Sequence, residues 1–330
     1  MFDHYISVDW GQNFMAIARL TRHSDKVSTV NGASSLEDLK IYLEKLRGTK
    51  VLTLEESTTA QWLYCELKEN VDKIIICDPY RNHLLSDGPK TDKIDAVKLV
   101  HLLRSNLIKP VFHTADDFIY FRKITSAYDD LIKAGVRLKN QRSALFRAAG
   151  MRKEEKVLQH PAEQFVLKGL DDGIKKYEEE KARYEEEFER ITKKYNAVKI
   201  LETIPGIGTI GATKIAARWV SARFKTKGQV LSYNGLIRHD RISDGKYYGS
   251  KKPRYCRSLK AVFKTAALNC IGPNAKGPIK QYYEYLIKEK RYCDYNARHA
   301  VARKIAILAY GIFKSGKQFN PELLKCSSNL

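Results

Sequence analysis

The sequence contains no C-x-x-C pair and no apolar run long enough to cross a lipid bilayer. Its six cysteines are scattered along 330 residues, a spacing that is typical neither of a zinc knuckle nor of a disulfide framework, so we expect buried free thiols. No window approaches the roughly 20 apolar residues that a membrane-spanning helix needs. The opening residues also lack the charged-then-apolar pattern of a signal peptide. We therefore expect a soluble, intracellular protein with no membrane partner.

The chain has far fewer acidic than basic residues. Lys and Arg number 59 against 38 Asp and Glu, which gives a formal net charge of +21. A surplus of this size favours a polyanionic partner such as nucleic acid. Because 43% of the residues are hydrophobic and 10% aromatic, the chain has enough apolar surface to exclude wholesale disorder. Its length predicts roughly two domains.

Strand and helix patterns alternate in the first third of the chain. The β-rich runs cover 5–20, 50–54 and 73–77, and the helical patterns cover 35–46 and 59–69. The first β-rich run is broken by Gly-Gln-Asn and therefore predicts a pair of strands. The alternation predicts an α/β domain with a mixed sheet over residues 1–115.

Helical patterns dominate the rest of the chain. A basic helical run extends from about 116 to 152, and apolar residues then follow a four-three heptad spacing, which is typical of a short coiled coil. The heptad residues are Leu170, Ile174, Tyr177, Tyr184, Phe188, Ile191, Tyr195 and Val198. The acidic runs beside them are interpreted as a solvated face. We expect a helical and coiled-coil segment over 116–200 and a mainly α-helical domain over 201–330.

Four carboxylates in the first region indicate a metal site. Asp9 ends the first predicted strand and Glu56 a later one, although Glu55 competes with Glu56 for this role. Asp92 and Asp95 are one helical turn apart and share a face if the run around them opens a helix. Four clustered acids would repel one another unless divalent cations neutralised them, and such a site suits two-metal chemistry on phosphates. The alternative is that each acid is a helix cap or a surface charge.

The turn IPGIG at residues 204–208 lies between two helical patterns. A tight turn of this kind presents backbone N–H groups and a helix N-terminus, which together can hold a phosphate. We therefore predict that Gly206 and Gly208 contact DNA in a helix-hairpin-helix-like element. An ordinary turn between two helices is equally consistent with the pattern.

Two serines, Ser243 and Ser250, fall in a Gly-containing segment that is predicted to be a loop. A serine hydroxyl becomes a nucleophile only where a base, a metal or a cationic pocket favours its alkoxide. Cations that would also grip the DNA backbone surround the two serines. These cations are Arg238, Arg241, Lys246, Lys251, Lys252 and Arg254. Without a further signal, a serine in such a loop is nearly always a turn residue.

Taken in order, these motifs resemble those of a known family, the DEDD transposases of the IS110 group, which are related to the Piv invertases and are described as bridge-RNA-guided recombinases. The N-terminal part is similar to their RuvC-like domain of RNase H fold, and the C-terminal part to their transposase domain. The N-terminal motifs are Val8-Asp9, Glu56-Ser57-Thr58 and KTDKIDA at 90–96, and the C-terminal ones are IPGIG, Arg223-Phe224, Tyr233-Asn234-Gly235-Leu236 and Ser243-Asp244-Gly245. The resemblance spans most of the chain.

The resemblance implies a set of roles and partners. Asp9, Glu56, Asp92 and Asp95 would bind Mg²⁺ or Mn²⁺, and Ser243 would attack a DNA phosphate to form a covalent link. Donor and target DNA would be the substrates, and a structured bridge RNA would select them. A homo-oligomer, from dimer to tetramer, is also implied, with which the heptad run is consistent. A protein with these partners is expected in the prokaryotic cytoplasm, at the nucleoid.

The serine motif departs from the family pattern. Family members commonly have a Ser-Gly pair, a longer basic loop and then Ser-Lys, whereas here Asp244 interrupts the pair and the loop to Ser250-Lys251 is short. Ser250 is therefore a rival nucleophile. Two other functions stay open: a RuvC-like Holliday-junction endonuclease that uses metal-activated water and no serine, and a non-catalytic nucleic-acid-binding protein whose binding follows charge and salt.

Overall fold

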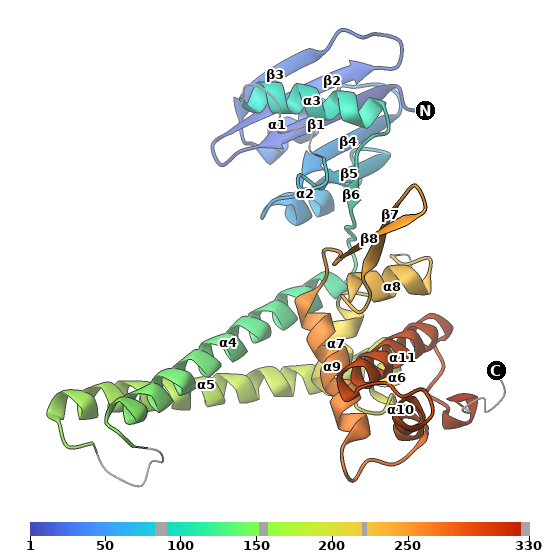
Figure 1. Ribbon diagram of the computed structural model, residues 1–330. Coiled ribbons are helices and arrows are strands. Elements are labelled where there is room, and N and C mark those ends of the chain that lie inside the picture. The colour runs from blue at the N-terminus through green and yellow to red at the C-terminus, as the bar shows by residue number, and fades with distance from the viewer. Residues whose placement is uncertain (83–90, 152–157, 220–222, 325–330) are drawn as a thin grey trace. The chain divides into compact units, whose positions relative to one another are not determined.

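The computed structural model describes residues 1–82, 91–151, 158–219 and 223–324. The chain divides into two compact units, Met1–Asp116 and Asp117–Leu330 (Figure 1). The segment 116–200, which the sequence sets apart, shares a hydrophobic core with the C-terminal helices. Phe121 and Phe188 of that segment are buried in the same cluster as Trp219.

The first unit is built on a six-stranded mixed sheet with the strand order β3-β2-β1-β4-β5-β6. Strands β1, β4 and β5 are neighbours and run parallel, whereas β2, β3 and β6 each pair antiparallel with a neighbour. The strands are β1 (His4–Trp10), β2 (Phe14–Thr21), β3 (Ser28–Ala33), β4 (Lys50–Glu55), β5 (Lys73–Cys77) and β6 (Pro110–Val111). The mixed α/β sheet of RNase H type that the sequence predicts is confirmed.

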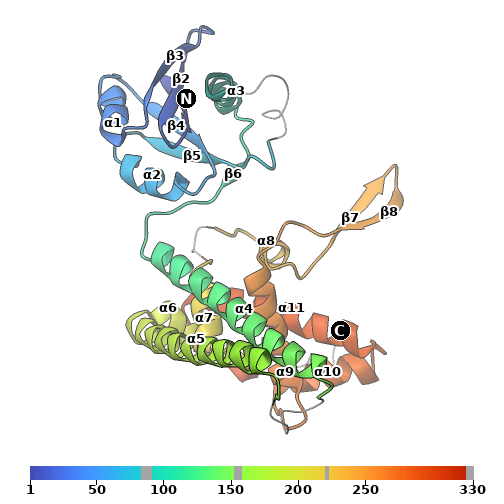
Figure 2. The ribbon, with the colours of Figure 1, turned by 90° about the vertical axis from the view of Figure 1, so that its left-hand side faces the viewer.

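Helices cover both faces of this sheet (Figure 2). On one face, α3 packs Ala96 and Val100 against Tyr5 of β1. On the other face, α1 and α2 pack over Ile6 and Val8 of the same strand. The alternation of side chains along a strand produces this division. The helices are α1 (Leu36–Glu44), α2 (Ala60–Leu67) and α3 (Asp92–Arg104).

Two long helices, α4 (Phe118–Ala148) and α5 (Pro161–Lys194), lie side by side in the second unit (Figure 1). The heptad face of α5 packs on α4. The ring centroid of Tyr128 in α4 is 5.1 Å from that of Phe188 and 5.8 Å from that of Tyr184. Pairing two amphipathic helices removes their apolar stripes from water. The heptad face of α5 is therefore covered by α4 of the same chain.

Shorter helices complete the second unit around a core of aromatic residues. The indole of Trp219 stacks on Phe263 with centroids 5.6 Å apart, and the Tyr310 hydroxyl donates to the carbonyl oxygen of Phe224 at 2.8 Å. The helices are α6 (Asn196–Glu202), α7 (Thr209–Ala216), α8 (Lys227–Tyr233), α9 (Arg257–Ile271), α10 (Pro278–Lys288) and α11 (Asp294–Ser315), followed by a 3₁₀ turn (Pro321–Leu324). None of the helices in the described residues is long and apolar enough to cross a membrane.

The described cysteines are all free thiols. Cys77 and Cys270 are buried as predicted, whereas Cys293 is exposed and Cys65 and Cys256 are half-buried. The sixth, Cys326, lies outside the described residues.

A β-hairpin replaces the loop that the sequence predicts around Ser243. Its strands are β7 (His239–Ser243) and β8 (Lys246–Lys251). Asp244 and Gly245 form the two-residue turn, with φ of 49° and 68°. Positive φ at both positions defines a type I′ turn, whose twist matches the strands and which Asp-Gly favours. The hairpin, residues 239–251, is called the ribbon below and projects from the helical body of its unit (Figure 2).

Candidate functional site

The ends of β1 and β4 bring two acidic side chains to one face of the sheet. In the parallel register Val8 lies beside Leu54, so the next pair along the strands is Asp9 and Glu55. Because side chains alternate along a strand, both acids point to the face that α3 covers. Glu56 follows one residue later, after β4 has ended.

The first turn of α3 adds Asp92 and Asp95 to this face. Ser7, two residues before Asp9, donates its hydroxyl to the carbonyl oxygen of Ala96 at 2.6 Å. This buried hydrogen bond fixes the start of α3 against the end of β1. The sheet and the helix therefore position the three aspartates together.

The pKa of Asp9 records this clustering. Burial, reinforced by the negative charges of Asp92, Glu55 and Asp95, raises the pKa of Asp9 to about 6. A cation bound here would offset the neighbouring negative charges and stabilise the ionised form of the Asp9 carboxyl group. Asp92 and Asp95 of the four predicted acids contribute to this shift, and the contributing acid from β4 is Glu55, the rival that the sequence left open, and not Glu56.

Asp95 offers an oxygen that fits a cation. Its Oδ1 is buried and has no hydrogen-bond partner in the described part of the chain. The ammonium of Lys98 is 3.9 Å from the same oxygen, which makes an ion pair but is too long for a hydrogen bond. An all-oxygen set of carboxylates is the kind of donor set that Mg²⁺ and Mn²⁺ prefer.

The four predicted acids are not assembled at ligand spacing. Within the residues that the structure describes, no three His, Cys, Asp or Glu side chains form a group that could hold a metal ion. Asp92 is exposed, and Glu56 lies 3.2 Å from Nε2 of His113, whose side chain is buried. Binding one ion by all four acids would require these side chains to close around it. The sequence offered no signal for His113, which is far from Glu56 along the chain.

The two serines occupy different places on the ribbon. Ser243 is the last residue of β7, pairs with Lys246 across the turn and is exposed. Ser250 lies near the other end of the ribbon, where Nε of Arg238 donates to its hydroxyl at 2.6 Å and Nη2 donates to its carbonyl oxygen at 2.8 Å. The guanidinium thus holds Ser250 in place, whereas Ser243 stands at the accessible turn.

The cations predicted to contact DNA form a strip with the ribbon. All six are exposed, and each lies on the ribbon or within three residues of it. They are Arg238, Arg241, Lys246, Lys251, Lys252 and Arg254. A strip of this kind can neutralise successive phosphates of a nucleic-acid backbone. Both serines and three of the cations thus lie on the ribbon, and the other three cations flank its base.

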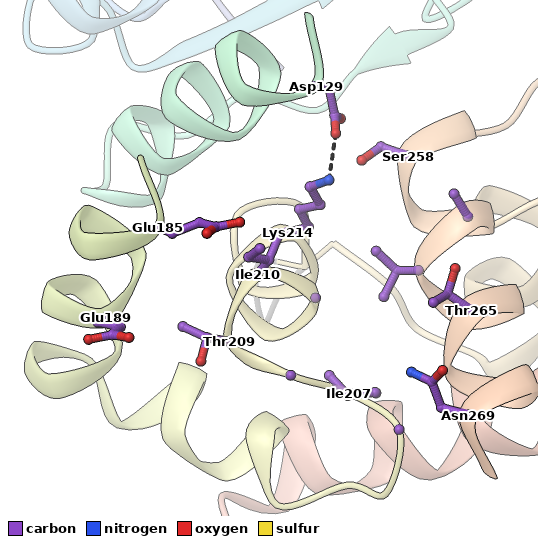
Figure 3. A pocket seen from close by; sticks show the side chains of 15 residues that line it. Asp129, Glu185, Glu189, Ile207, Thr209, Ile210, Lys214, Ser258, Thr265 and Asn269 are labelled. Carbon is purple, nitrogen blue, oxygen red and sulfur yellow. Dashed lines mark ion pairs between the residues drawn. The ribbon is translucent and has the colours of Figure 1, made fainter. Parts of the chain in front are cut away.

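The glycine turn between α6 and α7 has a different environment. Gly206 has φ of 81°, and a Cβ there would lie 2.5 Å from the carbonyl oxygen of Ala266, so the turn packs directly on α9. Gly206 and Gly208 line a pocket of about 520 Å³, in which Glu185 and Glu189 stand on the α5 side (Figure 3). A phosphate in this pocket would meet both negative charges. The close packing explains the glycine without DNA, and a DNA contact at the turn stays a prediction.

Comparison with known protein families gives two matches. Residues 6–150 match a DEDD model of the IS110 type, described as "Transposase". Residues 198–284 match the "Transposase IS116/IS110/IS902 family". No curated protein matches the chain. The first match contains the acids of the sheet unit, and the second contains the glycine turn and the whole ribbon.

Proposed function

The chain belongs to the IS110/IS116/IS902 family of transposases, and we propose that it cuts and rejoins DNA through a serine–DNA intermediate under the direction of a structured RNA. A transposase binds DNA and transfers phosphoryl groups between its strands. This chain therefore needs a group that attacks a phosphate, a means of stabilising the charge that develops and a surface that holds the strands.

Ser243 is the proposed nucleophile. Its Oγ would bond to the phosphorus of a DNA phosphodiester, the bond from phosphorus to one sugar oxygen would break, and the serine proton would pass to that oxygen. The strand would then be held as a serine ester, from which the hydroxyl of another strand can take it by the reverse steps. The observation that carries this role is the exposed place of Ser243 at the ribbon turn, opposite Lys246 and within the strip of cations.

Asp9, Glu56, Asp92 and Asp95 are the proposed holders of Mg²⁺ or Mn²⁺. A divalent ion would supply positive charge for the attacking and leaving oxygens of the phosphoryl transfer when it is bound. The raised pKa of Asp9 and the buried Oδ1 of Asp95, which has no hydrogen-bond partner in the described part of the chain, support the assignment of these two aspartates. His113 would orient Glu56, from which it is 3.2 Å away.

A guide RNA and a homo-oligomer belong to the same proposal. The net charge of +21 exceeds what the ribbon alone carries and supports a second nucleic acid. Because the heptad face is used within the chain, a second subunit would need another surface. Helix α4 offers one, since Val136 is 50% exposed beside Ile132 and Ala144.

Trapping the covalent intermediate tests the proposal. The protein would be incubated with its co-purified RNA, Mg²⁺ and DNA carrying the ends of its element, then denatured and assayed for protein-linked DNA. We expect Ser243→Ala to abolish the adduct and Ser250→Ala to retain it. The reverse result would transfer the role to Ser250. Cleaved DNA with no adduct in the unmodified protein would instead support a RuvC-like nuclease that uses water.

A further inference from the structure

The ribbon exposes three large side chains that the serine chemistry does not use. Ile242, Tyr247 and Tyr248 are 66%, 64% and 65% exposed. A two-stranded ribbon has no core of its own in which to bury such groups. Apolar groups that gather on one small element commonly mark a binding surface.

Two of these side chains form a single patch. Ile242 of β7 and Tyr247 of β8 are directly paired across the antiparallel ribbon, so their side chains lie on the same face. The next pair toward the turn is Ser243 with Lys246. Residues rise about 3.4 Å each along a strand and successive side chains alternate between the two faces, so Ser243 and Lys246 lie one step along the ribbon from the patch and on its other face.

The third side chain lies at an irregularity of the ribbon. The pairing register shifts between Asp240 and Ile242, with one more residue on β8 than on β7. Tyr248 and Gly249 therefore stand opposite Arg241. A bulge of this type re-aims side chains and strengthens the local twist. It sets Tyr248 beside a cation.

The base of the ribbon is anchored to the helical body. The Ser232 hydroxyl is 3.0 Å from Nε2 of His239, and the backbone N–H of Cys256 donates to the carbonyl oxygen of Tyr233 at 2.8 Å. Together with the contacts between Arg238 and Ser250, these bonds fix the stem. The patch is thus presented on an element whose base is held in place.

We propose that Ile242 and Tyr247 stack against DNA bases that open beside the cleaved phosphate. The inference rests on the proposed function, because strands can be exchanged only if the base pairs next to the cut separate. Separated bases lose their stacking neighbours, and an aromatic side chain can replace them. Apolar side chains wedged between base steps act in the same way. Lys246 and Arg241 are each one residue from the patch along their strands, and from the edge and the other face of the ribbon their long side chains can meet the phosphates of the same DNA strand.

Binding measurements in chelator test the inference without requiring cleavage. Fluorescence anisotropy would compare a duplex that contains a short mismatched bubble with the same duplex fully paired, over a range of salt concentrations. We expect Tyr247→Ala to weaken binding to the bubble about tenfold, in line with the free energy of stacking one base. Binding to the paired duplex and the salt dependence of both should stay as in the unmodified protein. Tyr247→Phe, which keeps the ring, should restore bubble binding.

A matched control separates stacking from a general loss of surface. Tyr120 in α4 is 62% exposed, so Tyr120→Ala removes an equally accessible ring elsewhere and should change neither affinity. Equal weakening on both duplexes, or no weakening on the bubble, would overturn the inference. So would binding to phosphatidylserine vesicles that Tyr247→Ala abolishes while bubble binding persists. Because no strand is cut in these assays, their outcome does not depend on whether Ser243 is the nucleophile.

Discussion

The two units present their functional groups in opposite ways. In the first unit, acids sit where strands and a helix end on a sheet that is packed on both sides, and Asp9 is half-buried with a raised pKa. In the second unit, the serine lies on a ribbon whose strands are mostly exposed, and the cations lie on this ribbon or beside its base. Like charges can be held together only by a rigid scaffold, since repulsion would otherwise separate them. A nucleophile and its cations must instead reach into the backbone of a large polyanion. Under the proposed function, each requirement falls to a different unit.

Neutralising the acids should have the largest effect on strand cleavage, and it should affect only the role proposed for the first unit. We expect Asp9→Asn and Asp92→Asn to slow Mg²⁺-dependent strand cleavage about a thousandfold, because several kcal/mol of charge stabilisation is lost at the phosphate. DNA affinity in chelator should be unchanged, since the ribbon is intact. Glu37→Gln, which removes an exposed acid from α1, serves as the control. Full cleavage by the unmodified protein in chelator would contradict the role of the acids.

Comparing Glu55 with Glu56 tests which of the two glutamates joins the three aspartates in binding the metal. We expect Glu56→Gln to reduce cleavage about as much as Asp9→Asn, because the family resemblance assigns Glu56 to the metal. Glu55→Gln should reduce it far less but should lower the pKa of Asp9, whose value the Glu55 charge helps to raise. Cleavage rates and NMR titration of the Asp9 carboxyl measure the two effects. The opposite order of rates would make Glu55 the ligand.

A substitution in the glycine turn tests whether the second unit depends on close packing there. In Gly206→Ala the new methyl group would meet the carbonyl oxygen of Ala266 in a backbone region that favours glycine. We expect the free energy of unfolding of this unit to fall by about 3 kcal/mol. Hydrogen exchange should show the loss in α6, α7 and α9 and no change in the sheet of the first unit. Stability equal to that of the unmodified protein would indicate that the turn serves a ligand instead.

The sequence predicted the elements whose side chains alternate between two environments. The sequence predicts strands β1, β2, β4 and β5 and helices α1, α2, α4 and α5, because each carries a stripe or face that is buried, and it allows a helix at α3. The edge strand β3 (Ser28–Ala33) has no buried residue and β6 has only two residues, so neither left a pattern to detect. The ribbon was missed for the same reason. The Asp-Gly turn was the available signal, because neither strand has a buried face and the ribbon therefore shows no alternation of apolar and polar residues.

The sequence also predicted only part of the candidate site, because individual side-chain contacts depend on the fold. Spacing was enough to suggest that Asp9, Asp92 and Asp95 approach one another, because strand ends and a helical turn have fixed geometry. Spacing could not choose between Glu55 and Glu56, since that choice depends on the face each residue takes where β4 ends. The contact between Glu56 and His113 joins residues distant in sequence. The heptad pattern likewise predicted a helix with an apolar face but did not identify α4 as its partner.

The raised pKa of Asp9 predicts a pH dependence of stability for the first unit. The folded state holds this proton up to about pH 6, whereas the unfolded chain loses it near pH 4. The stabilising contribution is therefore complete below about pH 4 and disappears as the pH rises to about 6. We expect Asp9→Asn to raise the metal-free stability of this unit above pH 6 by about 1 kcal/mol, because water partly screens the half-buried charge. Urea unfolding at pH 5 and pH 8, without and with Mg²⁺, measures it. A gain from Mg²⁺ in Asp9→Asn as large as in the unmodified protein would exclude Asp9 as a ligand.

The smallest expected effect belongs to a single cation of the ribbon. Each lysine that neutralises a phosphate releases about one counterion, so Lys246→Ala should reduce the slope of log affinity against log salt by about 0.9. The affinity itself should fall only a few-fold at moderate salt, and equally for paired and bubble DNA, because a phosphate contact does not distinguish the two. Lys276→Ala removes an exposed lysine outside the ribbon and should leave the slope unchanged. An unchanged slope in Lys246→Ala would mean that the ribbon does not follow the DNA backbone. The second unit would then have to bind DNA through another surface, and the contrast between a sheet unit for the metal and a ribbon for the strand would fail.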